Sequence, residues 1–142
     1  MLLDARLLLD VVETAAEWDN LANLHSQLRT AITQAIASTG SKAIVMTHLS
    51  HAYSDGASLY VTFLGRRAFD GEMEQWQTIK NAAMECIMQL GGTTSHHHGV
   101  GYEHAAWLAQ EAGAAGIAAL RGVKQALDPD AIMNPGKVIH EA

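Results

Sequence analysis

Histidines gather in the middle of this chain of 142 residues, which contains eight of them. His96, His97 and His98 are consecutive inside the segment 91–101, which also contains four glycines, and His48 and His51 lie earlier in the chain. Imidazoles change charge near neutral pH, so a group of them can donate hydrogen bonds, relay protons or stabilise an anion. The glycines allow close backbone approach, which favours a functional loop over the alternative of a solvated polar loop.

A metal centre is a second interpretation of the same residues. His51, the histidine triplet and Asp55 offer ligand types that suit zinc or another divalent ion. Successive side chains of an extended segment point to opposite sides, so we expect at most His96 and His98 to share one ion. The spacing therefore supports a metal site only weakly.

Tyr60 is a candidate acid or base on a predicted strand. A phenol takes that role only when an imidazole or a cation lies next to it. The alternative is a half-buried tyrosine with a structural hydroxyl, and the residue type alone favours this alternative.

These residues must be positioned by strands and helices that the apolar periodicity predicts. We expect strands over 7–13, 43–49 and 59–64, with a turn at 54–56. Thr14 and Glu17 have the spacing of a capping box, so a helix should begin there and continue to Ser38. Its predicted apolar stripe consists of Trp18, Leu21, Leu24, Leu28, Ile32 and Ile36.

A second helix is predicted from Gly71 to Leu90, ending at Gly91-Gly92. Its stripe consists of Met73, Trp76, Ile79, Ala83, Ile87 and Leu90. Further helical segments are expected over 105–112 and 116–127. This order of elements predicts an α+β fold, with an antiparallel sheet, helices packed on one face and additional helices at the C-terminal end.

Composition narrows the function classes. Hydrophobic residues make up 49% of the chain and charged ones 17%, and the net charge is -6. An acidic chain without a basic cluster is not expected to bind nucleic acid; the Arg66-Arg67 pair is expected to form surface ion pairs. We expect no signal peptide and no membrane span. The single Cys86 suits a reducing compartment, and we expect a cytoplasmic location.

Three segments together resemble a known family. They are residues 47–60, residues 91–101 with Ser-His-His-His-Gly-Val-Gly, and residues 127–137 with Asp-Pro and Asn-Pro-Gly-Lys. The chain is similar to the C-terminal part of FAD-linked oxidases of the vanillyl-alcohol oxidase superfamily, most of all to the alkyldihydroxyacetonephosphate synthase branch.

The resemblance implies an architecture and a set of roles. Residues 1–92 would form the ferredoxin-like half of a cap domain that binds substrate, and residues 93–142 would return to the flavin domain. Tyr60 would take and return a proton at the substrate carbon. His96, His97 and His98 would polarise it and stabilise charge. His98 and Asn134 would contact the flavin, and His48 and His51 would contact the substrate. In that branch, the reaction exchanges an acyl group for a fatty alcohol.

The resemblance also implies what the chain needs. FAD would be bound mainly by an N-terminal domain outside this sequence, so we expect a C-terminal portion of an enzyme that is inactive alone and forms homo-oligomers through uncovered apolar surface. In the 2-hydroxy acid dehydrogenase branch a glutamate ligates metal where His97 stands, so we expect no metal here. The alternatives are an α+β binding module without catalysis and a metal-dependent site like that of the dehydrogenases.

Overall fold

The computed structural model describes residues 6–139 as two compact units, the first ending at Thr93 and the second beginning at Thr94. The start of the predicted first segment, residues 1–5, and the last three residues of the predicted second segment lie outside the described part. No helix in the described part of the chain is long and apolar enough to cross a membrane.

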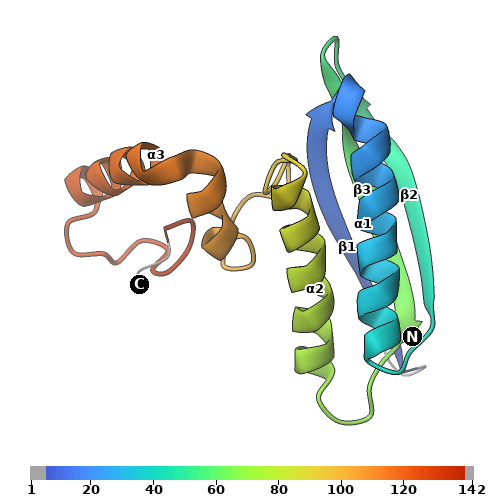
Figure 1. Ribbon diagram of the computed structural model, residues 1–142. Helices are drawn as coiled ribbons and strands as arrows, with labels where there is room; N and C mark the ends of the chain where they lie inside the picture. Colours follow the sequence, from blue (N-terminus) through green and yellow to red (C-terminus); the bar gives the residue numbers. More distant parts are fainter. Residues whose placement is uncertain (1–5, 140–142) are drawn as a thin grey trace. The chain divides into compact units, whose positions relative to one another are not determined.

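The first unit is built on a three-stranded antiparallel sheet (Figure 1). Its strands are β1 (Leu7–Glu17), β2 (Ala43–Ala52) and β3 (Gly56–Arg66), in the spatial order β1-β3-β2. A tight turn joins β2 to β3, and the Tyr53 amide donates to the Gly56 carbonyl over 2.8 Å. The predicted α+β class and antiparallel sheet are confirmed, and each strand is longer than its apolar core suggested.

Two helices cover one face of the sheet and form the core. They are α1 (Trp18–Ser38) and α2 (Glu72–Gln89), which pack against each other along their length (Figure 1). Leu24, Leu28, Ile32 and Ile36 of the first predicted stripe are fully buried, as are Ile79, Ala83 and Ile87 of the second. The first residue of each stripe differs from the prediction, because Trp18 is 45% exposed and Met73 is 68% exposed.

The predicted capping box is wrong. Thr14 and Glu17 belong to β1, where they pair with Leu59 and Gly56 of β3, and the helix begins only at Trp18. The Thr14 hydroxyl donates to the Thr93 carbonyl over 2.9 Å rather than capping a helix. Pairing with β3, which is distant in the sequence, therefore overrides the local signal for a helix start.

Polar side chains tie α2 to the sheet. Lys80 is 4% exposed, and its ammonium group donates to the Val11 carbonyl at 2.8 Å and lies 3.4 Å from the Asp10 carboxylate. The Trp76 indole donates to the same carboxylate at 2.6 Å. A buried ammonium group needs such partners, so these contacts fix the position of α2 along β1.

The second unit contains α3 (Ala105–Leu127) and a tail folded back by side-chain contacts. Gly113 has φ 66° and ψ 174°, so it separates two helical stretches, as the predicted ranges 105–112 and 116–127 require. After α3, the Asp128 carboxylate accepts hydrogen bonds from the amides of Ile132 (3.1 Å) and Met133 (2.9 Å) and from the Lys124 ammonium group. One carboxylate therefore shapes the turn that leads into the tail.

A substitution at Gly92 tests the packing where the end of α2 meets β1. An added Cβ would lie 2.7 Å from the Thr14 hydroxyl and about 3 Å from the side chains of Ile87 and Leu24. We expect Gly92→Ala to lower the free energy of unfolding by about 1–3 kcal/mol, the usual cost of overpacking. Urea unfolding followed by circular dichroism measures it.

Gly122→Ala is the control for this experiment, because nothing lies within 4 Å of a Cβ added at that helical position. It should leave stability unchanged or raise it by up to about 1 kcal/mol through helix propensity. Equal stability of the two variants would contradict the packing at Gly92.

Asp128 gives a pH-dependent prediction. The Lys124 ammonium group first, and then the Met133 amide, hold the pKa of Asp128 below its ordinary value. The charged carboxylate therefore stabilises the tail at pH values above about 3.9, and this stabilisation is lost as the pH falls through the lowered folded-state pKa. At pH 7, Asp128→Ala should speed hydrogen exchange at the Ile132 and Met133 amides roughly fivefold, the loss of about one hydrogen bond.

The control is Asp130→Ala, because Asp130 is exposed in the same turn. Exchange at the two amides should stay at the parental rate in this variant. Unchanged exchange in Asp128→Ala would show that the carboxylate does not hold the tail.

Candidate functional site

Tyr60 lies in the middle of a polar row that crosses all three strands. The register places it opposite Glu13 of β1 and opposite His48 of β2. Directly paired residues of an antiparallel sheet share a face. Their neighbours Val12 and Val61 are buried beneath the helices, so the row lies on the face turned away from α1 and α2.

His48 contacts Tyr60 directly. The two rings stack with centroids 5.1 Å apart and an interplanar angle of 30°. The imidazole is exposed and the phenol half-buried. The imidazole neighbour that acid–base action of this phenol requires is therefore present, and it comes from the adjacent strand.

His51 lies further along β2, where a register irregularity occurs between Leu49 and Ala52. Its amide donates to the Ser58 hydroxyl at 3.0 Å, and its Nδ1 lies 3.4 Å from the same oxygen. Ser58 is buried next to Leu59 in β3. The irregularity and Ser58 together orient this imidazole at the end of the strand.

The histidine triplet forms a contiguous group of rings in the second unit. Nδ1 of His96 lies 3.1 Å from Nδ1 of His97, and their rings meet edge to face. The centroids of the His97 and His98 rings are 4.5 Å apart, with an interplanar angle of 67°. The expectation that adjacent rings point apart is wrong, because these residues form bends rather than an extended strand.

A bond between two Nδ1 atoms has a chemical consequence. As a hydrogen bond, this contact requires one ring to donate its Nδ1–H and the other to accept it. His97 touches both neighbours and is therefore the central ring of the triplet. The group is suited to holding or passing a proton.

Two side chains of the second unit anchor the loop that carries the triplet. Before the triplet, the Thr94 amide donates to the Glu111 carboxylate over 2.6 Å. After it, His104 is 7% exposed and its Nδ1 lies 3.0 Å from the Gly99 carbonyl, which as an acceptor requires the proton on Nδ1. The loop is thus held at one end by a side chain of α3 and at the other by the N-cap residue of α3.

The tail returns to the same loop and carries Asn134. The Tyr102 hydroxyl donates to the Pro135 carbonyl at 2.8 Å, and the Val138 amide donates to the Gly101 carbonyl at 3.1 Å. Asn134 has φ 47°, a left-handed conformation that asparagine tolerates. Asn134 and the triplet therefore belong to one unit, whereas His48, His51 and Tyr60 belong to the other.

Sequence reasoning missed Glu13, Glu111 and His104 as parts of this arrangement. Glu13 is 2% exposed, and the available signal was a carboxylate inside the apolar run of β1. His104 is one of the eight histidines, but no local sequence pattern identified it as the N-cap of α3. Glu111 had no signal, because its contact to Thr94 spans 17 residues.

The first unit therefore brings together a phenol, an imidazole and a carboxylate in one row. A stacked imidazole next to a phenol allows proton transfer through the phenolic oxygen, and a carboxylate opposite it adds a negative charge or an acceptor. The second unit offers a proton-sharing imidazole pair on a fixed loop. Both are suited to acid–base chemistry on a small molecule.

Comparisons with known proteins identify the family of this chain. The chain is 35% identical to an alkyldihydroxyacetonephosphate synthase of Trypanosoma brucei brucei over 92% of its own length and 21% of the relative. It is also 35% identical to the synthase of the same name from Dictyostelium discoideum, over 97% of its own length and 23% of the relative. The chain spans about a fifth of these relatives.

Solved structures give the same relationship. The fold matches an alkyldihydroxyacetonephosphate synthase with a TM-score of 0.66 and 27% identity, over 94% of this chain and 21% of that one. A second crystal form of a protein with that name matches with a TM-score of 0.58 and 25% identity. Residues 1–138 match the family described as FAD linked oxidases, C-terminal domain. The chain belongs to the FAD-linked oxidases, as their C-terminal domain.

Proposed function

We propose that this chain is the cap and C-terminal part of an FAD-dependent enzyme of the alkyldihydroxyacetonephosphate synthase type. In this proposal residues 1–92 form the substrate-binding cap, and residues 93–142 return to the flavin domain. The observation that supports it most is the row of Glu13, Tyr60 and His48 on the sheet face turned away from the helices. The identity to the two synthases over nearly the whole chain supports the reaction class.

Tyr60 is the proposed proton acceptor and donor at the substrate carbon. The stacked His48 ring favours proton movement through the phenol, and we assign His48 and His51 to substrate contact. Glu13, opposite Tyr60 in the register, is the proposed acceptor that orients this row. None of these roles needs an ion.

The triplet and Asn134 are the proposed contacts to the flavin. FAD supplies a ring that accepts and returns electrons when it is bound. The chain's own residues fit such a ring, because a flat heterocycle needs hydrogen-bond donors and edge contacts of the kind that His96, His97 and His98 offer. In this proposal His97 holds the proton that it shares with His96, and His98 and Asn134 orient the ring.

The proposed partners are a small-molecule substrate and the N-terminal FAD-binding domain. Leu9, Ile44 and Met46 are about half exposed on the sheet face that carries Tyr60. An exposed apolar surface of this kind supports the proposal that the N-terminal domain covers this face. Without that domain the chain is proposed to be inactive and to associate with itself through this surface. The free thiol of the half-buried Cys86 suits the proposed cytoplasmic location, because thiols stay reduced there.

A chimera tests the role of Tyr60. This chain would replace the matching fifth of the Dictyostelium discoideum synthase, and flavin absorbance, turnover and solvent-deuterium incorporation at the substrate carbon would be measured. Tyr60→Phe should retain flavin absorbance but lower turnover about 10²–10⁴-fold and stop the incorporation, because the proton carrier is lost.

Tyr53→Phe is the matched control, since Tyr53 lies in the turn between β2 and β3 and is 52% exposed. It should leave turnover and incorporation unchanged. Full activity of Tyr60→Phe would refute the proposed role.

A second variant tests the role of the triplet independently of Tyr60. In the same chimera, His97→Asn should lower turnover at least tenfold, because the ring that contacts both neighbours is removed. Ion analysis of the purified protein before and after chelator treatment accompanies it. Bound stoichiometric metal whose removal abolishes activity would favour the metal-dependent alternative instead.

A further inference from the structure

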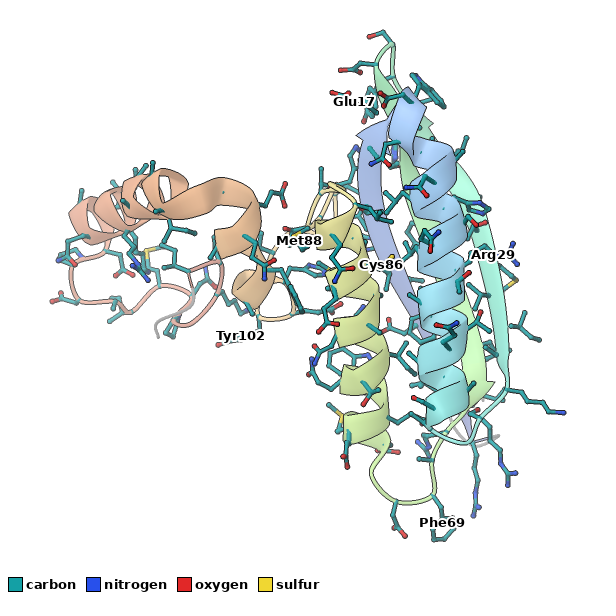
Figure 2. The ribbon with its side chains drawn as sticks, in the orientation of Figure 1. Glu17, Arg29, Phe69, Cys86, Met88 and Tyr102 are labelled. Carbon is teal, nitrogen blue, oxygen red and sulfur yellow. The ribbon has the colours of Figure 1, made fainter. Side chains whose placement is uncertain are left out.

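Three arginines line a pocket at the end of the sheet where β1 begins and β3 ends. Arg6, Arg66 and Arg67 share this pocket, of about 210 Å³, with the turn after α1 and with Phe69. Phe69 lies in the loop before α2 (Figure 2). Arg66 lies six residues along β3 from Tyr60, which corresponds to roughly 20 Å in an extended strand. The pocket is therefore separate from the polar row described above.

The charge of this pocket contrasts with that of the chain. The net charge is -6, yet three of the nine basic residues lie here. Arg67 pairs with Glu72 at 3.2 Å. Among residues 6–139, no carboxylate lies within ion-pair distance of Arg6 or Arg66. Within this described part, the guanidinium groups of Arg6 and Arg66 therefore have no carboxylate ion-pair partner, whereas the sequence predicted surface ion pairs for Arg66-Arg67.

A buried amide organises the segments around this pocket. Gln75 is 4% exposed, and its side chain donates to the Thr39 hydroxyl at 3.0 Å and to the Arg66 carbonyl at 3.1 Å, while accepting from the Ala68 amide at 2.8 Å. These bonds join the end of α1, the end of β3 and the loop before α2. The Arg66 amide adds a hydrogen bond to the Ser41 hydroxyl over 2.8 Å.

Arg6 is held in place as well. Its backbone has φ 55°, and its carbonyl accepts a hydrogen bond from the Arg67 amide over 2.8 Å. Its guanidinium carbon lies 4.8 Å from the centre of the Phe69 ring, a cation–π contact. An arginine oriented in this way loses little side-chain freedom when it binds an anion.

We propose that this pocket binds a phosphomonoester group. Planar guanidinium groups match phosphate oxygens with paired hydrogen bonds, and a doubly charged group suits two guanidinium groups better than a carboxylate does. A pocket of about 210 Å³ has room for the phosphate and a small organic group. Phe69, 79% exposed at the rim, offers an apolar surface to that organic group. This inference does not depend on the proposed function.

The test uses the chain itself and glycerol phosphate as the soluble probe. Calorimetric titration at constant ionic strength should show saturable binding of one equivalent. Arg66→Gln and Arg6→Gln should each weaken it about tenfold, the effect of losing one charged hydrogen-bonding partner. Arg29→Gln is the matched control, because Arg29 is an exposed arginine of α1 away from the pocket (Figure 2), and it should bind as the parent does.

A second arm identifies the source of the phosphate group. Vesicles of phosphatidylcholine, with and without phosphatidic acid, are mixed with the same proteins and sedimented. The pocket is assigned to a lipid headgroup if the protein binds only vesicles that contain phosphatidic acid, Arg66→Gln abolishes this binding, and glycerol phosphate does not bind. Binding of glycerol phosphate in solution assigns the pocket to a soluble phosphomonoester. Binding in neither arm, or equal weakening by Arg29→Gln, overturns the proposal. Circular dichroism confirms that each variant is folded.

Discussion

The antiparallel pairing of β3 with both of its neighbours is the constraint on which the first unit depends. Side chains alternate between the two faces of a strand, so a slip of one residue would exchange the faces. Val61 and Phe63 would then leave the core, and Tyr60 would be driven beneath α1. The packing of two apolar residues therefore also fixes which face the phenol occupies. Stability and the placement of the candidate site have the same physical origin.

The second unit depends on polar contacts more than on a core. In α3 only Ala105 is buried among the described helix residues, and the loop and tail are held instead by Glu111, His104, Tyr102 and Asp128. Such bonds fix geometry while contributing little net stability each. The imidazole triplet is therefore carried by a segment whose shape is determined by a few specific side chains.

Much of the fold follows from local patterns, and the exceptions come from distant contacts. The apolar periods of α1 and α2 and the alternation in β3 predicted elements that the structure confirms, because burial of one face requires that spacing. The capping box at Thr14 failed because β3 competes for the same backbone. The likeness of residues 47–60 and 91–101 to a family identified Tyr60 and the triplet as candidates.

Other features of the sites have no local signature. The stacking of His48 on Tyr60 follows from strand register. The contact between His96 and His97 follows from backbone bends, which the sequence of three consecutive histidines does not predict. The arginine pocket brings residue 6 together with residues 66, 67 and 75, and no short stretch of sequence contains all of these positions.

The outer position of β2 has a practical consequence. Its far edge has no strand partner among the described residues, and Ile44, Met46 and Leu49 are each more than half exposed. A strand of this kind is a template onto which other chains add and from which fibrils nucleate. Preparations of this polypeptide by itself are best kept dilute and cold, and a lysine replacing Met46 would act as a gatekeeper against precipitation.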